Sequence, residues 1–180
     1  MNIISTGFNG LLILEPKVLG DSRGYFMESY NSQTLRDHNI NTVFVQDNQS
    51  SSRKGVLRGL HFQRAPHAQT KLVRALTGSI LDVVVDLRSS EPTFGKHFSV
   101  ELSGENKRQL LVPKGFAHGF IVLSDMAEVF YKCDECYNPS ADGGIHYDSV
   151  DVDWKLPASS FILSDKDKNL LHITKANFQF

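Results

Sequence analysis

The sequence predicts an all-β protein built as a sandwich or a barrel. Short stretches of alternating apolar and polar residues recur at intervals of about ten residues along most of the chain. Glycine, asparagine, aspartate and proline separate these stretches, as is typical of turns between strands. With 180 residues, 41% of them hydrophobic, the chain is long enough for one ample core. We therefore expect a single domain over residues 1–180, ending in a tail from residue 158.

The first predicted strands surround one short helix. Residues 11–18 form a strand, a turn follows at 20–24, and alternation over 25–30 puts Phe26, Glu28 and Tyr30 on one face of the next strand. Residues 31–39 are expected to form a helix that begins at Asn31 or Ser32, since both residue types are favoured N-caps. The chain returns to a strand at 42–50.

Residues 55–74 place charged side chains within apolar strands. Arg58 and His61 lie in the first of these strands, Lys71 and Arg74 lie in the second, and residues 64–69 connect them. Removing an unpaired cation or imidazole from water is costly, so this pattern usually marks a site. Taken singly, Arg58 and Lys71 fit equally well as solvent-facing side chains with buried stems, and His61 fits as a core histidine.

The next strand, residues 79–88, turns two carboxylates to one face. Alternation places Asp82 and Asp86 together, opposite a face of leucine and valine. We interpret Asp86 and Arg88 as surface charges on a half-solvated outer strand, and leave the place of Asp82 open. The remaining expected segments are strands at 97–103, 109–113, 114–124 and 126–133, a loop at 138–144, an extended stretch at 150–157 and a polar, partly helical tail at 164–173.

Composition argues against several functions. The net charge of −1 gives no basic surface for nucleic acid or for an anionic membrane. No apolar run is long enough to cross a bilayer, and the first residues lack the basic region of a secretory signal, so we expect a cytoplasmic protein. Cys133 and Cys136 form a single C-x-x-C pair without a second pair to complete a zinc site, and are interpreted as reduced thiols.

One short motif narrows the barrel to a cupin-like jelly roll, a double-stranded β-helix with a few short peripheral helices. Residues 113–118 have the P-x-G-x-x-H spacing of the second cupin motif, which turns His118 toward the barrel interior. The first cupin motif would supply H-x-H and a glutamate, but His61 is followed by Phe62 and Gln63. Two imidazoles are short of the three protein ligands usual in a catalytic metal site, so we expect a barrel without a metal.

Several longer segments resemble the bacterial dTDP-4-dehydrorhamnose 3,5-epimerase family. That family converts dTDP-4-keto-6-deoxy-D-glucose to dTDP-4-keto-L-rhamnose. The resemblance therefore implies an isomerase that needs no cofactor and that takes a dTDP-sugar as substrate. The matching segments are GDSRGYFMESY, FVQDNQSSSRKGVLRGLHFQ, KLVRALTGSILDVVVDLR, SVELSGENKRQLLVPKGFAHGF and LSDKD.

The resemblance implies four catalytic residues. His61 matches the base that removes a proton beside the C4 ketone, and Asp167 matches the carboxylate that orients it. Lys71 matches the cation beside the C4 oxygen, and Tyr131 matches the acid on the opposite face of the sugar. Only the spacing in the family selects Asp167 over Asp165, and a buried core tyrosine is the plain alternative for Tyr131.

The resemblance also implies a set of residues that contact the sugar, the diphosphate or the thymidine. Asp142 is one methylene shorter than the glutamate common in the family. Alternation would put Arg58 and His61 on opposite faces, so both reach one pocket only if Gly59 marks a bulge or the end of the strand. The implied substrate-binding residues are Arg23, Glu28, Gln46, Asn48, Arg58, His118, Tyr137, Asp142 and Lys166.

The same resemblance implies a homodimer in which an N-terminal strand is exchanged between subunits. Two alternatives to 3,5-epimerisation stay open: a relative that epimerises only C3 or only C5, and a metal-dependent cupin or sugar-binding module without this chemistry. The complete set of His61, Lys71, Tyr131 and Asp167 favours double epimerisation, and the incomplete first cupin motif argues against the metal-dependent form.

Overall fold

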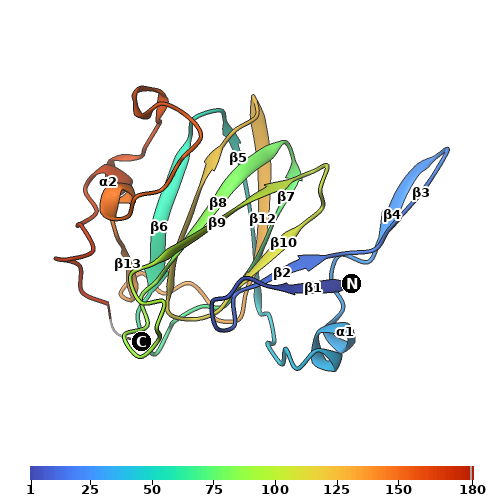
Figure 1. Ribbon diagram of the computed structural model, residues 1–180, viewed down its shortest axis with the longest axis horizontal. Coiled ribbons are helices and arrows are strands. Elements are labelled where there is room, and N and C mark those ends of the chain that lie inside the picture. Colours follow the sequence, from blue (N-terminus) through green and yellow to red (C-terminus); the bar gives the residue numbers. More distant parts are fainter. Residues whose placement is uncertain (179) are drawn as a thin grey trace.

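The computed structural model describes residues 1–178 and 180 as two β-sheets that face each other, with a hairpin outside them (Figure 1). The larger sheet has the strand order β1–β2–β10–β7–β12–β5, and the smaller has the order β13–β6–β11–β8–β9. This arrangement is the predicted all-β, cupin-like jelly roll. The strands are β1 Asn2–Ser5, β2 Leu12–Glu15, β3 Val18–Asp21, β4 Gly24–Met27, β5 Gln46–Arg53, β6 Leu57–Gln63, β7 Lys71–Thr77, β8 Ser79–Asp86, β9 His97–Ser103, β10 Gln109–Val112, β11 Phe116–Val122, β12 Met126–Cys133 and β13 Asp142–Gly144.

Apolar side chains fill the space between the sheets and also cover both outer faces. On β8, Ile80 and Val84 belong to the cluster between the sheets, whereas Leu81 and Val83 belong to a second cluster beneath the C-terminal segment. The predicted alternation of this strand is therefore confirmed, but both of its faces are buried. A third, smaller cluster lies where helix α1 (Ser32–Asp37) contributes Leu35 against the larger sheet.

The N-terminal third is less regular than predicted. The strand expected at 11–18 ends at Glu15, since Pro16 has no N–H group to continue the ladder. The strand expected at 25–30 ends at Met27, so the predicted shared face with Glu28 and Tyr30 was wrong. Helix α1 begins as predicted, because the Asn31 side chain accepts hydrogen bonds from two backbone N–H groups of the first turn.

The C-terminal third shows two differences from the predictions. Within the expected loop at 138–144, β13 (Asp142–Gly144) pairs with the edge of β6. The stretch 150–157 forms no strand, and its one tryptophan, Trp154, packs beneath the outer face of the smaller sheet. The polar tail does turn helical, but only over helix α2 (Asp165–Lys168). None of the helices in the described part of the chain is long and apolar enough to cross a membrane.

Asp86 is not a surface charge, and this prediction was wrong. Its side chain is fully buried at the end of β8, where the loop that follows folds back over it. Arg88 donates to both carboxylate oxygens, at 2.8 and 2.7 Å, and Thr93 donates at 2.6 Å. Burial would raise the pKa of Asp86, but these hydrogen bonds hold it below its ordinary value. The alternation of apolar and polar residues in β8 does not predict that the following loop covers the end of the strand.

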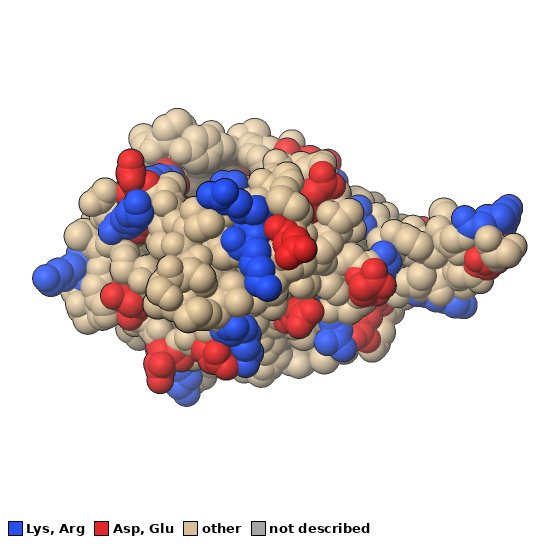
Figure 2. Space-filling model, turned by 90° about the horizontal axis from the view of Figure 1, so that it is seen from above, with Lys and Arg blue, Asp and Glu red and all other residues tan. Residues whose placement is uncertain are grey.

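The hairpin of β3 and β4 projects from the body of the molecule (Figures 1 and 2). It pairs with no other strand of the described chain, and Arg23 at its turn forms an ion pair with Asp21 at 2.5 Å. Large apolar side chains on it face solvent, including Leu19 and Phe26, which are 54% and 69% exposed. An isolated two-stranded hairpin is marginally stable in water, so these side chains are suited to contact another surface.

Strands β6 and β11 leave no room for a side chain between them at Gly59 and Gly119. His118 pairs with His61 and Phe120 pairs with Arg58, so two residues of β6 face one residue of β11 between these pairs. This bulge at Gly59 confirms the expected irregularity, and it turns Arg58 and His61 toward the same cavity. A Cβ atom at Gly119 would lie 2.4 Å from the Arg58 carbonyl oxygen.

Replacing Gly119 by alanine should therefore destabilise the fold. The added methyl group would meet the backbone of β6, and neither strand can move away without breaking the hydrogen bonds between β6 and β11. We therefore expect a loss of about 1–3 kcal/mol in the free energy of unfolding. Urea denaturation measures it. Gly20→Ala is the matched control, because the nearest atom to its added Cβ would be 3.7 Å away. Equal stability of the two variants would contradict the close approach.

Candidate active site

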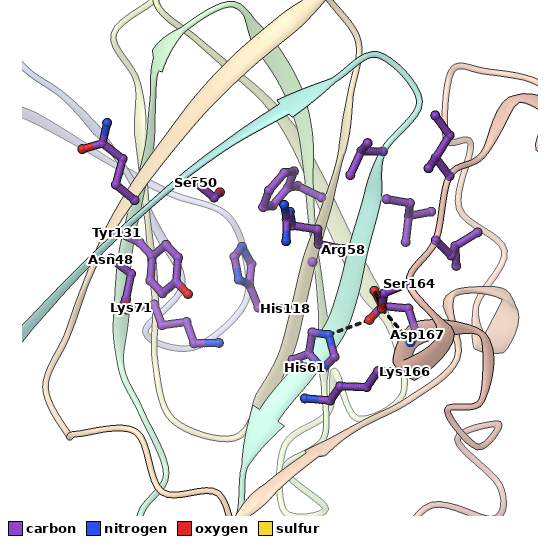
Figure 3. A pocket seen from close by; sticks show the side chains of 17 residues that line it. Asn48, Ser50, Arg58, His61, Lys71, His118, Tyr131, Ser164, Lys166 and Asp167 are labelled. Atoms are coloured by element: carbon purple, nitrogen blue, oxygen red, sulfur yellow. Dashed lines mark hydrogen bonds and ion pairs between the residues drawn. The ribbon is translucent and has the colours of Figure 1, made fainter.

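One cavity of about 600 Å³ lies between the sheets and receives side chains from both of them and from the C-terminal segment (Figure 3). Tyr131 and Lys71 reach it from β12 and β7 of the larger sheet. His61 reaches it from β6 of the smaller sheet, beside helix α2. The predicted site residues that line it are Asn48, Arg58, His61, Lys71, His118, Tyr131, Lys166 and Asp167.

His61 and Asp167 form a close pair in the cavity wall. The His61 Nε2 atom lies 2.7 Å from Asp167 Oδ1, and Asp167 is only 4% exposed. The other ring nitrogen, Nδ1, is shielded from solvent and has no hydrogen-bond partner in the described residues. An ionised carboxylate only accepts hydrogen bonds, so Nε2 donates to Asp167 and Nδ1 keeps the lone pair.

Asp167 owes its position to the capping of helix α2. Ser164 accepts a hydrogen bond from the Asp167 backbone N–H and donates its hydroxyl to Asp167 Oδ2 at 2.6 Å. Burial would raise the pKa of Asp167, but the hydrogen bonds from His61 and Ser164 hold it below its ordinary value. Asp165 is 96% exposed and pairs with Lys168. Ser164 was not among the residues predicted for the site, although the S-x-x-D spacing is a recognised capping pattern.

Lys71 is a cation without a close counter-ion. No described carboxylate lies within 4.0 Å of its ammonium group, and its side chain points into the cavity (Figure 3). Desolvation lowers the pKa of Lys71, against smaller opposing effects of Cys133, Asp82 and Asp142. A positive charge fixed in a poorly solvated site and left unpaired is suited to stabilise an oxyanion.

Tyr131 lies across the cavity from His61 (Figure 3). Its strand, β12, turns Ala127, Val129 and Cys133 toward the interior together with it, as the alternation predicted. Burial raises the pKa of Tyr131, so its hydroxyl group stays protonated near neutral pH. It can therefore donate a proton from the side of the cavity opposite a histidine that can accept one.

Two further side chains of the cavity wall are held by partners that the sequence analysis did not assign. Arg58 donates to the Ser52 hydroxyl from Nε at 3.2 Å and from Nη2 at 3.1 Å. The His118 Nε2 atom lies 2.9 and 3.1 Å from the two oxygens of Asp82, which is fully buried. The carboxylate left open by the alternation of β8 thus fixes the orientation of a cavity histidine.

The other predicted site residues do not line this cavity. Arg23 and Glu28 lie on or next to the projecting hairpin, where they contact Asp21 and Asn31. The remaining three are Gln46, Tyr137 and Asp142, which hydrogen-bond to one another or to side chains that do line the cavity.

Gln63 replaces the second histidine of the first cupin motif and serves another purpose. It is buried, donates to the His67 and Cys136 carbonyl groups, and accepts from the Asn138 backbone N–H at 2.7 Å. Its amide therefore anchors the loop after β12. Within residues 1–178 and 180, no three His, Cys, Asp or Glu side chains are grouped to bind a metal ion. Cys133 and Cys136 are free thiols, one buried and one exposed.

The fold and this arrangement define a cupin-like barrel whose cavity residues are suited to acid–base chemistry and to the stabilisation of an oxyanion. The sequence model of the family described as dTDP-4-dehydrorhamnose 3,5-epimerase matches residues 5–175. The chain belongs to this family.

Relatives and solved structures agree with this assignment. The dTDP-4-dehydrorhamnose 3,5-epimerase of Shigella flexneri is 53% identical over 172 residues, which cover 94% of each chain. A structure of dTDP-6-deoxy-D-glucose-3,5-epimerase from Legionella pneumophila Philadelphia 1, in complex with dTDP-4-keto-L-rhamnose, is 46% identical with a TM-score of 0.94, and the match covers 99% of this chain and 98% of that one. The Bacillus anthracis dTDP-4-dehydrorhamnose 3,5-epimerase, with TDP and PPi bound, is 46% identical with a TM-score of 0.91 over 94% of this chain and 97% of that chain.

The unpaired position of Lys71 should cost stability. We expect Lys71→Met to be more stable than the unaltered protein at pH 7 by about 0.5–2 kcal/mol, because the substitution removes a desolvated charge and keeps the volume. The folded-state pKa of Lys71 is lowered, so the unfolded chain binds more protons below pH 10.5, and the penalty shrinks as pH rises toward that value. Urea denaturation from pH 7 to 10 measures the difference.

The matched control is Lys155→Met, which removes an exposed lysine paired with Asp153. Its effect on stability should be within about 0.5 kcal/mol of zero. A loss of stability in Lys71→Met, or a gain that does not change with pH, would contradict the unpaired state of this cation.

Proposed function

We propose that this protein converts dTDP-4-keto-6-deoxy-D-glucose to dTDP-4-keto-L-rhamnose by epimerisation at C3 and C5, without a cofactor. The observation that carries the proposal is the His61–Asp167 pair facing Tyr131 across a cavity that also contains the unpaired Lys71. A C4 ketone acidifies the hydrogens on both neighbouring carbons. Inverting those centres takes a base on one face, an acid on the other and a charge to hold the enolate.

The arrangement of the cavity supports one assignment of the proton transfers. The His61 imidazole takes a proton from carbon, and the electrons of the broken C–H bond form the enolate, whose oxygen lies beside the Lys71 ammonium group. Asp167 stabilises the imidazolium that forms. Tyr131 then delivers its proton to the same carbon from the opposite face, which inverts the centre, and exchange with solvent restores both residues. The cycle serves C3 and C5 in turn.

The remaining cavity residues suit a nucleoside diphosphate. Arg58 offers a planar guanidinium that binds two phosphate oxygens at once, and Lys166 adds a second positive charge. The relatives named above bind dTDP-4-keto-L-rhamnose in one case and TDP in the other. We take the dTDP part of the substrate to lie along this side of the cavity.

Epimerisation of C3 alone or C5 alone is the second candidate. A single-centre epimerase needs the same base and acid, so the cavity residues alone do not separate it from the double epimerase. The family of the chain and its bound relatives favour double epimerisation. A binding module without chemistry has no use for a base paired with a buried carboxylate or for an unpaired cation.

Incubation with dTDP-4-keto-6-deoxy-D-glucose in heavy water tests the proposal directly. We expect deuterium at both C3 and C5 of the nucleotide sugar, measured by mass spectrometry against an enzyme-free sample, because each centre loses one proton and gains another from solvent. Deuterium at one carbon would identify a single-centre epimerase. No incorporation would contradict the proposed reaction.

Three variants test whether the reaction depends on His61 and Asp167. His61→Asn and Asp167→Asn should lower turnover by a factor of roughly 10² to 10⁴, since they remove the base or the charge that stabilises its protonated form. Asp165→Asn, two residues away on the same helix, should stay close to the unaltered rate because its carboxylate faces solvent. Equal losses in Asp165→Asn and Asp167→Asn would contradict the assignment.

We propose further that the protein is a homodimer in which an N-terminal segment of each protomer serves the cavity of its partner. Arg23 and Glu28 match substrate-binding positions of the family but do not line the cavity of their own chain. The hairpin that carries Arg23 projects away from the body with Leu19 and Phe26 exposed. Strand β1 pairs with β2 of the same chain, so the β3–β4 hairpin is the segment that we propose to be exchanged.

Mixed dimers test this exchange. We expect Arg23→Ala and His61→Asn each to be impaired alone, and their co-expression to recover up to roughly a quarter of the unaltered activity, since half of the dimers would hold one complete site. If Arg23 served its own chain, no mixed dimer would contain a complete site. Sedimentation of a monomer only, or activity no higher than the sum of the two variants, would contradict the proposal.

A further inference from the structure

A second, much smaller space lies at the end of the barrel where β6 ends and β7 begins, which we call the base. Its lining includes Gln63, the last residue of β6, and Lys71, the first residue of β7, and it is too narrow to hold a water molecule. Lys71 and His118 line both this space and the cavity of the candidate site. These two side chains therefore separate the cavity from the base of the barrel.

The ring of Phe180 closes this space from outside the strands. It meets the buried ring of Phe62 edge to face, with ring centroids 5.5 Å apart, and Phe178 packs on the same ring at 6.4 Å. Figure 1 shows this end of the chain at the base of the barrel. Phe180 is 43% exposed, so its ring reaches solvent while it also lines the space beside Lys71.

The seat of this ring is built from well-fixed parts of the barrel. A Cβ atom at Gly115 would lie 2.3 Å from Cγ of Arg88 and 3.7 Å from Cγ of Phe180, so the glycine allows both side chains to come close. The Arg88 guanidinium is held by Asp86 and lies over the ring of Phe116, 4.4 Å from its centroid. Phe180 thus packs against a base that is ordered by an ion pair and by buried rings.

The location of Phe180 matters because of the charge on Lys71. Water beside a charge weakens its attraction for a nearby anion, so an ammonium group stabilises an oxyanion best when water is kept away from it. A ligand that fills the cavity displaces water from one side of Lys71 only. On the other side, at the base of the barrel, Phe180 is the residue of the C-terminal segment that lines the space.

We propose that Phe180 is a positioning residue for the reaction, because its ring closes the base of the barrel and keeps water away from the Lys71 ammonium group without contacting the substrate. This inference rests on the proposed function, since it takes Lys71 as the group that stabilises the enolate. Phe180 was not among the residues predicted for the site from the sequence.

An NMR titration of the full chain, with its lysines labelled with ¹³C, tests the inference. The signal of Lys71 is identified by its absence in Lys71→Met. Desolvation lowers the pKa of Lys71, so water admitted by Phe180→Ala should raise this pKa by about half a pH unit or more. Phe180→Leu keeps an apolar side chain at the base and should stay within about 0.2 pH unit of the unaltered protein. Neither variant changes the titratable side chains around Lys71, which are His61, Asp82, His118, Tyr131, Cys133 and Asp142.

Phe94→Ala is the matched control. Phe94 is 45% exposed and packs on Phe178, with ring centroids 6.2 Å apart, but it lines neither the cavity nor the space at the base. Its removal should therefore leave the pKa of Lys71 unchanged. An unchanged pKa in Phe180→Ala would overturn the inference, and so would an equal rise in Phe94→Ala, because that would show a general loosening of the C-terminal segment.

Steady-state kinetics give a second readout. We expect Phe180→Ala to lower kcat about three- to tenfold and to change KM by less than about twofold, because the weakened interaction is the one made with the enolate. A rise in KM larger than the fall in kcat would show a contact with the bound substrate, and would overturn the inference.

The pKa of Lys71 is measured without turnover, so this inference and the proposed function fail separately. Deuterium exchange by the unaltered protein together with an unchanged pKa in Phe180→Ala would leave the reaction standing and remove the role of Phe180. A raised pKa in Phe180→Ala without deuterium exchange by the unaltered protein would remove the reaction and the catalytic role of Phe180 with it, and would leave only the closure of the barrel.

Discussion

The contact between His61 and Asp167 joins the barrel to the C-terminal segment, and the shape of the site depends on it. His61 comes from β6, whereas Asp167 comes from a four-residue helix that has little stability of its own. Backbone hydrogen bonds between Ile162 and the residues just before and within β6 bring the helix to this wall. Ser164 then caps the helix and fixes the carboxylate. Packing of a nearly structureless segment thus sets the geometry of the His61–Asp167 pair.

Lys71 differs from His61, because no carboxylate of the described chain is paired with its charge. Lys71 of β7 pairs with Cys133 of the neighbouring strand β12. Burial raises the pKa of the Cys133 thiol to about 11, so the thiol stays neutral and supplies no counter-charge. Asp82 lies near enough to act on Lys71 through space, but its oxygens are taken up by His118. The positive charge is therefore available to the enolate of the proposed reaction, an anion that exists only during turnover, and an interaction of this kind favours a transition state over a substrate.

The sequence pattern correctly predicted the features of the fold that depend on residues close together in the chain. The alternation of β8 and β12, the cap at Asn31 and the bulge at Gly59 all follow from residues close in sequence, and the structure confirms each of them. The loop that buries Asp86 and the pairing of β13 with β6 depend on distant segments, and these were wrong or missed. For the candidate site, family motifs located the residues of the cavity but did not tell which of them reach it from their own chain.

Lys166 and Arg23, which are in contact with water, have carboxylate partners, whereas Lys71 inside the barrel has none among the described residues. Lys166 at the cavity and Arg23 on the projecting hairpin are each paired with an aspartate and remain in contact with water, so a ligand can replace or share such a partner at little cost in free energy. Inside the barrel, a carboxylate paired with Lys71 would have to be separated from it in a poorly solvated space, which is far more costly. Asp142 and Asp21 can therefore restrain cations that are proposed to bind the substrate. An acidic side chain paired with Lys71 would neutralise the charge that the proposed enolate requires, so a carboxylate partner is compatible with the binding role proposed for Lys166 but not with the catalytic role proposed for Lys71.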